Sequence, residues 1–139
     1  MKSTKGNAMA KILVVDDEPF VLELLNTVLK RKGHEVILAS MGHRGVETFV
    51  KEQPQVTILD LNLPDMDGIA VLKKIRSVNH LAPVIILTGG GSETAQDEAR
   101  ELGVVDFLPK EFSLHRLGDA LSRALGPAAP TASVSGRAR

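Results

Sequence analysis

Five short apolar runs, separated by segments with helical spacing, constrain the fold of this chain more than any other feature. The runs are Ile12–Val15, Val36–Ala39, Val56–Leu59, Val84–Leu87 and Val104–Leu108. They are rich in β-branched residues and almost wholly apolar, a pattern typical of strands that are covered on both faces, as in a parallel sheet.

The segments between these runs repeat apolar residues at intervals of three or four, as one face of a helix does. The apolar positions are Val21, Leu24, Leu25, Val28 and Leu29; Val46, Phe49 and Val50; Ile69, Leu72 and Ile75; Ala95, Ala99 and Leu102; and Leu114, Leu117, Leu121, Ala124 and Leu125. Gly33 and Gly126 are placed to end the first and the last helix. The fourth segment, roughly 92–102, has the weakest stripe, so we expect the least firmly anchored helix there.

Five strands that alternate with five helices predict an α/β fold with a doubly wound, five-stranded parallel sheet. The common strand order for such a sheet is 2-1-3-4-5, as in flavodoxin-like folds. Its ligand crevice lies between the carboxyl ends of the first and third strands, and this position directs the search for functional residues.

The length of 139 residues is typical of one domain. We expect residues 1–9 to form a disordered leader, residues 10–126 the folded domain, and the Pro- and Ala-rich residues 127–139 a disordered tail or the start of a linker. The longest apolar runs have four or five residues, too short to cross a membrane. No signal-peptide pattern is present at the N-terminus.

The chain has 17 basic residues (lysine and arginine) and 17 acidic residues (aspartate and glutamate), so its formal net charge is zero. Its overall charge therefore does not indicate nucleic-acid binding. The chain contains no cysteine, which excludes a disulfide framework and a thiolate zinc site. These features predict a cytoplasmic protein without direct nucleic-acid or membrane binding.

Polar residues follow several of the predicted strands at the edge where the crevice is expected. Asp16, Asp17 and Glu18 follow the first strand, Asp60 ends the third, Thr88 ends the fourth, and the fifth runs into Lys110. Converging carboxylates repel one another unless a cation or raised pKa values compensate. An oxygen-rich site with few protein ligands suits Mg²⁺, while a hydroxyl and an ammonium group suit an anion bound beside it.

Each of these residues also has an ordinary structural interpretation when taken alone. Asp17 could cap the first helix, with Pro19 in the first turn. Asp60 could open a turn, Thr88 could simply end a strand, and Lys110 could be a solvated surface lysine. The functional interpretation is favoured because all of them fall at carboxyl ends of strands around the same crevice.

The motifs resemble the receiver domain of two-component response regulators, the CheY-like family. The matching stretches are Ile-Leu-Val-Val-Asp-Asp-Glu-Pro (12–19), Leu-Asp-Leu-Asn-Leu-Pro-Asp-Met-Asp-Gly (59–68), Ile-Ile-Leu-Thr-Gly (85–89) and Asp-Phe-Leu-Pro-Lys (106–110). The resemblance covers residues 11–125 and implies a phosphorylation-activated signalling switch rather than an enzyme with an external substrate. Such a domain catalyses only its own Mg²⁺-dependent phosphorylation and dephosphorylation.

The resemblance also implies a role for each residue. Asp60 corresponds to the phosphoacceptor, and the metal ligands are Asp16, Asp17, Asp60 and the backbone carbonyl of Asn62. Thr88 and Lys110 correspond to the hydroxyl and the ammonium group that contact the phosphoryl oxygens. Thr88 and Phe107 correspond to the switch pair that reports phosphorylation.

The implied partners are a sensor histidine kinase or a histidine phosphotransfer protein, and a downstream protein or fused output domain. The family's usual interaction face consists of the fourth helix, fifth strand and fifth helix. The resemblance therefore allows a homodimer through that face. One departure is Glu111, which follows Lys110 where the family usually has proline, often after a cis peptide bond. We therefore expect either a different loop or a strained one at this position.

Two other protein classes share features with this pattern. A flavodoxin-like electron carrier has the same topology, but it needs a glycine- and hydroxyl-rich phosphate loop where this chain has Asp16-Asp17-Glu18. A Mg²⁺-dependent phosphatase with an aspartyl nucleophile needs a second aspartate at position 62, which is Asn here, and a cap insertion.

Overall fold

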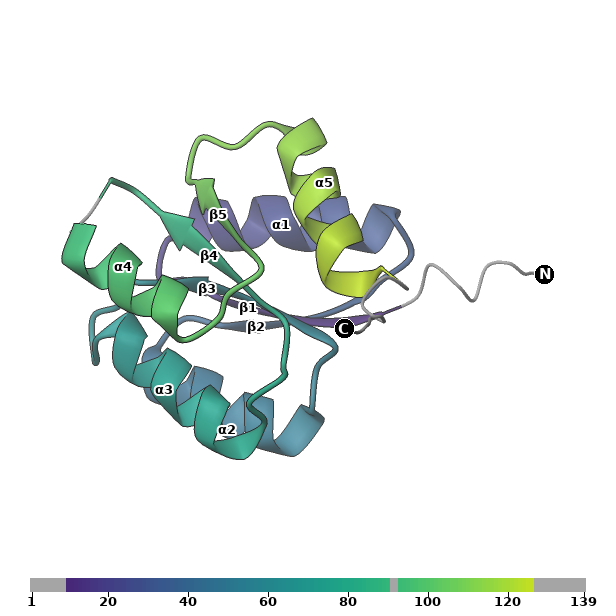
Figure 1. The fold of residues 1–139 in the computed structure, drawn as a ribbon. Helices are drawn as coiled ribbons and strands as arrows, with labels where there is room; N and C mark the ends of the chain where they lie inside the picture. The colour runs from purple at the N-terminus through teal and green to yellow at the C-terminus, as the bar shows by residue number, and fades with distance from the viewer. Residues whose placement is uncertain (1–9, 91–92, 127–139) are drawn as a thin grey trace, which may run out of the picture.

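A computed structural model describes residues 10–90 and 93–126 of the chain (Figure 1). The strands are β1 (Lys11–Val15), β2 (Glu35–Ala39), β3 (Val56–Asp60), β4 (Val84–Thr88) and β5 (Asp106–Pro109). The helices are α1 (Pro19–Arg31), α2 (Gly42–Glu52), α3 (Gly68–Val78), α4 (Glu93–Glu101) and α5 (Leu114–Leu125). The predicted leader (1–9) and tail (127–139) lie outside the described residues.

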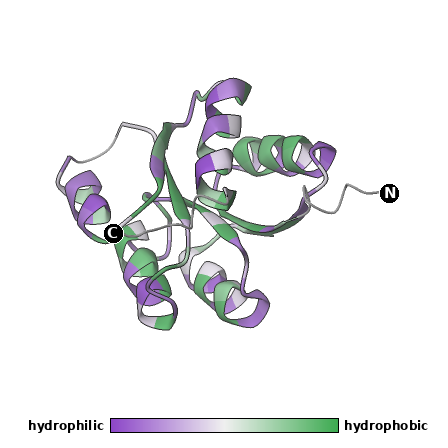
Figure 2. Cartoon of the chain, turned by 45° about the vertical axis from the view of Figure 1, so that its right-hand side comes forward, coloured by the Kyte–Doolittle hydropathy of each residue, from purple (hydrophilic) through white to green (hydrophobic). Residues whose placement is uncertain are grey.

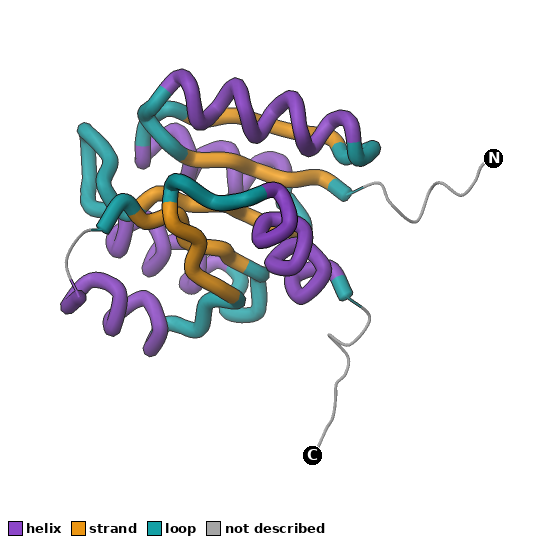
Figure 3. The backbone as a smooth tube through the Cα atoms, turned by 90° about the horizontal axis from the view of Figure 1, so that it is seen from above, coloured by secondary structure: helices purple, strands orange, loops and turns teal. Residues whose placement is uncertain are grey.

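The strands form one parallel sheet in the order β2-β1-β3-β4-β5, which confirms the predicted topology. Seen from above, the helices run alongside the strands that they connect (Figure 3). In this order β1 and β3 are neighbours, although α1, β2 and α2 separate them in the sequence. The carboxyl ends of β1 and β3 therefore lie side by side, where Asp16, Asp17 and Asp60 are found.

Two apolar layers hold the helices to the sheet, with α1 and α5 on one face and α2, α3 and α4 on the other. The alternation of side chains along each strand feeds both layers: Ile12 and Val14 face the first, and Leu13 and Val15 the second. On the helices, apolar residues face the sheet and polar residues face outward (Figure 2). Burial on both faces explains why the strands are near-continuous apolar runs.

The fifth strand begins two residues later than the predicted Val104–Leu108. The chain first completes the end of α4, where the Gly103 amide donates to the Arg100 carbonyl and Gly103 adopts a φ of 83°. Pairing with β4 then starts as the Val105 amide donates to the Val84 carbonyl at 2.8 Å. Val104 and Val105 are apolar like the strand residues that follow, so hydrophobicity alone did not show where the turn ended.

Helix α4 is weakly packed, in agreement with its short apolar stripe. Ala99 is the only buried residue of α4, whereas α3 buries Gly68, Ile69, Val71, Leu72 and Ile75. The C-terminal end of α4 is held by Arg76, whose guanidinium donates to the carbonyls of Leu102 and Gly103 at 2.6 Å each. Within the described residues, no helix is long and apolar enough to span a bilayer.

Candidate functional site

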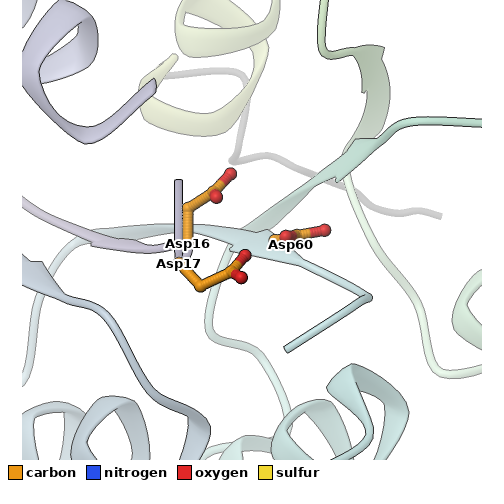
Figure 4. Close-up of side chains that lie close together, drawn as sticks. All are labelled: Asp16, Asp17 and Asp60. Atoms are coloured by element: carbon orange, nitrogen blue, oxygen red, sulfur yellow. The ribbon is translucent and has the colours of Figure 1, made fainter. Parts of the chain in front are cut away.

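Three carboxylates meet where β1 and β3 end. Asp16 and Asp17 follow β1, Asp60 is the last residue of β3, and each offers an oxygen within 4.8 Å of the other two (Figure 4). Asp16 and Asp60 are fully buried, whereas Asp17 is exposed. The structure thus brings together the three aspartates that the sequence placed at one edge of the sheet.

Lys110 joins this cluster from the end of β5. Its Nζ lies 2.9 Å from Asp60 Oδ2, 3.4 Å from Asp16 Oδ2 and 3.3 Å from Glu18 Oε1. Partial burial by itself would lower the lysine pKa, but the hydrogen bond to Asp60 and the charges of Asp16 and Asp60 outweigh it and raise the pKa. Lys110 therefore stays charged and is not the solvated surface lysine of the alternative interpretation.

The charged form of Asp16 is disfavoured by its surroundings even though Lys110 lies nearby. Burial raises its pKa, and the Asp60 charge adds to that rise, against the opposing effects of the Glu18 amide and Lys110. Its Oδ2 is buried and accepts no hydrogen bond, although Lys110 Nζ is 3.4 Å away. A buried carboxylate oxygen without a donor, in an all-oxygen cluster, fits a hard divalent cation such as Mg²⁺.

Backbone amides orient the two buried aspartates. The Glu18 amide donates to Asp16 Oδ1 at 2.8 Å, and the Asn62 amide donates to Asp60 Oδ1 at 3.0 Å. Helix α1 begins at Pro19 with Glu18 as its N-cap, and no side chain caps it. Asp17 is therefore not a helix cap, and its carboxylate remains available to the cluster.

The loop from Asp60 to α3 is compact and closely packed. Residues Asn62 and Asp67 form an isolated antiparallel bridge across its base, and Asp67 Oδ1 caps α3 by accepting from the Ile69 amide at 3.0 Å. Gly68 packs against the backbone of Asp60 and Leu61, because a Cβ there would lie 2.7 Å from each carbonyl oxygen. Only glycine fits this position without moving the backbone that carries Asp60.

Asp65 ties the tip of this loop to α2, a contact that the sequence analysis did not predict. Its carboxylate accepts from the amides of Gly42 at 2.6 Å and His43 at 3.0 Å, and His43 Nδ1 lies 2.5 Å away. The hydrogen bonds from the His43 and Gly42 amides hold the pKa of Asp65 well below its usual range. The N-cap of α2, Met41, has no capping side chain, so Asp65 supplies the cap from the neighbouring loop.

Thr88 lies at the end of β4 but faces α4 rather than the carboxylates. Its Oγ1 accepts from the Gly90 amide at 3.2 Å and from Gln96 Nε2 at 3.4 Å. Thr88 and Gln96 line a cavity of about 440 Å³ between α4 and the loop after β3, as do Asn62, Asp67 and Thr94. In the described structure, the Thr88 hydroxyl makes no hydrogen bond to Asp60 or Lys110.

Phe107 is partly buried on β5 and packs against the layer that contains α4. The Arg100 guanidinium lies over its ring, 5.1 Å from the ring centroid, in a cation–π contact. On the other side, Arg116 Nη2 donates to the Phe107 carbonyl at 2.9 Å. The residue thus lies between α4 and α5, where a change in its position would reach both helices.

The loop after Lys110 does not use a cis peptide bond, since the described residues contain none. The strained loop with a cis bond before Glu111, one of the two alternatives raised by the sequence, is therefore not present in the described residues. Lys110 still reaches Asp60, and its backbone amide donates to the Thr88 carbonyl at 3.0 Å. Pairing with β4 thus continues as far as Lys110.

The model of the response regulator receiver domain family matches residues 12–122, nearly the whole described part of the chain. The chain belongs to this family. The receiver domain is 34% identical over 115 residues to sporulation initiation phosphotransferase F of Bacillus subtilis, an alignment that covers 83% of this chain and 93% of that protein. It is 40% identical over 103 residues to the alkaline phosphatase synthesis transcriptional regulatory protein PhoP of the same organism, covering 74% of this chain but 43% of PhoP.

Among solved structures, a CheY-like receiver domain protein from Methanospirillum hungatei superposes with a TM-score of 0.81 at 25% identity, covering 84% of this chain and 94% of that one. Together these likenesses confirm the resemblance drawn from the motifs, and with it the CheY-like fold. The chain is thus a phosphorylation-activated signalling switch of two-component systems. The family membership also removes the flavodoxin-like and phosphatase alternatives.

Proposed function

We propose that Asp60 of this receiver domain accepts a phosphoryl group from the histidine of a sensor kinase or phosphotransfer protein. The observation that carries the proposal is the environment of its buried carboxylate. One oxygen is fixed by the Asn62 amide, and the other by the Lys110 ammonium. Two further aspartates stand within 4.8 Å of it.

The carboxylates of Asp16, Asp17 and Asp60, with the backbone carbonyl of Asn62, would hold the Mg²⁺. The buried Oδ2 of Asp16 supports this assignment, because within the described residues it accepts no hydrogen bond and its ion-pair partner, Lys110, is 3.4 Å away. When bound, Mg²⁺ neutralises charge on the carboxylates and on the phosphoryl oxygens. The protein's share of the ligand shell is small, as is usual for this ion.

Transfer requires positioning and charge neutralisation more than covalent machinery. An oxygen of Asp60 attacks the phosphorus atom in line with the donor nitrogen, the P–N bond breaks, and its electron pair returns to the imidazole. Lys110 balances the charge of the incoming phosphoryl oxygens, and the Thr88 hydroxyl then donates a hydrogen bond to one of them. Water at the same site then hydrolyses the acyl phosphate, which releases inorganic phosphate, restores the Asp60 carboxylate and limits the lifetime of the signal.

The signal would leave the domain through α4, β5 and α5. The weak packing of α4 and the position of Phe107 between α4 and α5 support this route. The receiver would act on a downstream protein or on an output domain in the same polypeptide, and a homodimer through this face is one form of output. Relatives of both lengths exist, since the chain spans 93% of one and 43% of another.

Beryllofluoride, which mimics the phosphoryl group, provides the test. Isothermal titration calorimetry is suitable, because the chain has no Trp or Tyr to report binding by fluorescence. We expect binding that requires Mg²⁺ and that disappears in Asp60→Asn, whose amide cannot carry the group. Binding of equal strength in Asp60→Asn, with the variant folded by circular dichroism, would exclude Asp60 as the acceptor.

A further inference from the structure

The Thr88 hydroxyl is held by two donors that both come from the α4 side of the site. The Gly90 amide and Gln96 Nε2 donate to Oγ1 at 3.2 Å and 3.4 Å. Gln96 is a half-buried residue of α4, eight positions along the chain. The oxygen is therefore anchored in the cavity between α4 and the loop after β3, which Thr88 and Gln96 both line.

Within the described residues, the Thr88 hydroxyl makes no hydrogen bond to the proposed phosphoacceptor. Asp60 directs its oxygens to the Asn62 amide and to Lys110, and neither Asp60 nor Lys110 lines the cavity that holds Gln96. The Thr88 hydroxyl has to turn toward Asp60 to contact a phosphoryl oxygen there. The contact with Gln96 must then break, unless α4 follows.

The two ends of α4 differ in how they are attached. Arg76 holds the C-terminal end through the Leu102 and Gly103 carbonyls, and Glu98 Oε2 pairs with Lys73 Nζ at 2.9 Å. Towards the N-terminal end, Glu93 and Thr94 are exposed. Gln96, nearer the N-terminal end, contacts Thr88, while Arg100, one turn later on the same face, contacts Phe107.

From these contacts we propose that Gln96 is a positioning residue that holds the Thr88 hydroxyl on the α4 side and so lowers the affinity of the site for the phosphoryl group. The inference rests on the proposed function and adds to it a contact that opposes movement of the Thr88 hydroxyl. A contact made only in the resting arrangement favours that arrangement, so its loss on binding reduces the observed affinity. The same contact couples movement of Thr88 to movement of α4.

The test compares the affinity of Gln96→Ala and the unaltered chain for beryllofluoride at saturating Mg²⁺. We expect about two- to fivefold tighter binding in Gln96→Ala, the effect of one partly exposed hydrogen bond. Thr94→Ala, which trims another side chain of the same cavity, is the matched control and should bind as the unaltered chain does. In a Thr88→Ala background the Gln96→Ala gain should vanish, which a general loosening of α4 would not produce.

Unchanged or weaker binding in Gln96→Ala would overturn the inference, because Gln96 would then be neutral or would assist Thr88. An equal gain in the Thr88→Ala background would also overturn it. Thermal unfolding of every variant confirms that it is folded. If the unaltered chain itself fails to bind beryllofluoride, the proposed function is refuted first, and this outcome is distinct from a failure of the Gln96 effect alone.

Discussion

The two loops that flank Asp60 are built very differently. The loop from β3 to α3 is fixed at its base by the bridge between Asn62 and Asp67. At its tip, Asp65 accepts hydrogen bonds from the amides of Gly42 and His43 at the start of α2. On the other side, the Thr88 hydroxyl accepts two hydrogen bonds of 3.2 Å and 3.4 Å. The helix that follows buries only Ala99.

This difference separates two tasks that one small domain has to perform. In-line transfer needs the acceptor carboxylate and its metal ligands to stay in place, and the β3–α3 loop provides that rigidity. A response needs an element whose position changes at low cost, and α4 provides it because few apolar contacts hold it. The firm side therefore carries the chemistry, and the loose side carries the signal.

The largest expected effect comes from adding the same methyl group on each side. Gly68→Ala should lower the free energy of unfolding by about 3 kcal/mol or more, because the new Cβ meets backbone atoms of Asp60 and Leu61 that cannot move aside. Gly89→Ala should change it by less than about 0.5 kcal/mol, since the nearest atom is Lys110 Cδ at 3.8 Å. Urea denaturation followed by circular dichroism measures both, and equal losses would remove the contrast between the loops.

A smaller effect should follow from releasing the tip of the firm loop. Asp65→Ala removes the cap of α2 and should lower Tm by a few degrees at neutral pH. Folding lowers the pKa of the Asp65 carboxyl group. Asp65 therefore stabilises the protein above the ordinary pKa of aspartate, about 4, and this stabilisation fades as the pH falls below that value.

The two Tm curves of Asp65→Ala and the unaltered chain should therefore converge in acid. His43→Gln is the control, because it keeps the backbone amide that donates to Asp65 and removes only the imidazole. A deficit that persists unchanged at low pH would show that the carboxylate is not the anchoring group.

The smallest expected effect concerns the buried charge of Asp16. Folding raises the pKa of Asp16. Its contribution to the stability of the fold is therefore most favourable below the pKa that it has in the unfolded chain, and it is lost as the pH rises through its pKa in the folded protein. Asp16→Asn keeps an acceptor for the Glu18 amide and should stabilise the metal-free protein by about 1 kcal/mol at pH 7.

The same variant should lose the stabilisation that Mg²⁺ gives the unaltered chain, which is about 1.4 kcal/mol at ten times the dissociation constant. Thermal unfolding with and without Mg²⁺ measures both effects. A less stable Asp16→Asn variant that still responded to Mg²⁺ would contradict the cation assignment.

The sequence predicted those features that repeat or that follow from topology. The apolar runs identified all five strands, and the strand order brought Asp16, Asp17 and Asp60 to one edge, because parallel strands end together. Lys110 followed from the same rule. The weak anchoring of α4 was visible because helix packing follows the apolar stripe.

The contacts that distinguish the two loops could not be predicted in this way. Asp65 reaches amides 22 and 23 residues earlier, and Gln96 reaches Thr88 from another element. Such hydrogen bonds join polar side chains that have no periodic pattern, and they depend on how two loops are placed in space. The start of β5 was missed because Val104 and Val105, which follow the turn at Gly103, are apolar but precede the strand.

Amide hydrogen exchange, followed by mass spectrometry with and without beryllofluoride in the presence of Mg²⁺, tests the central claim most directly. In the free protein, α4 (Glu93–Glu101) should exchange much faster than α3 (Gly68–Val78). On binding, the large change should occur in α4 and β5, with residues 61–67 already protected and nearly unaffected. A response concentrated in residues 61–67 and α2, with α4 unchanged, would contradict the division between a firm acceptor side and a loose signalling side.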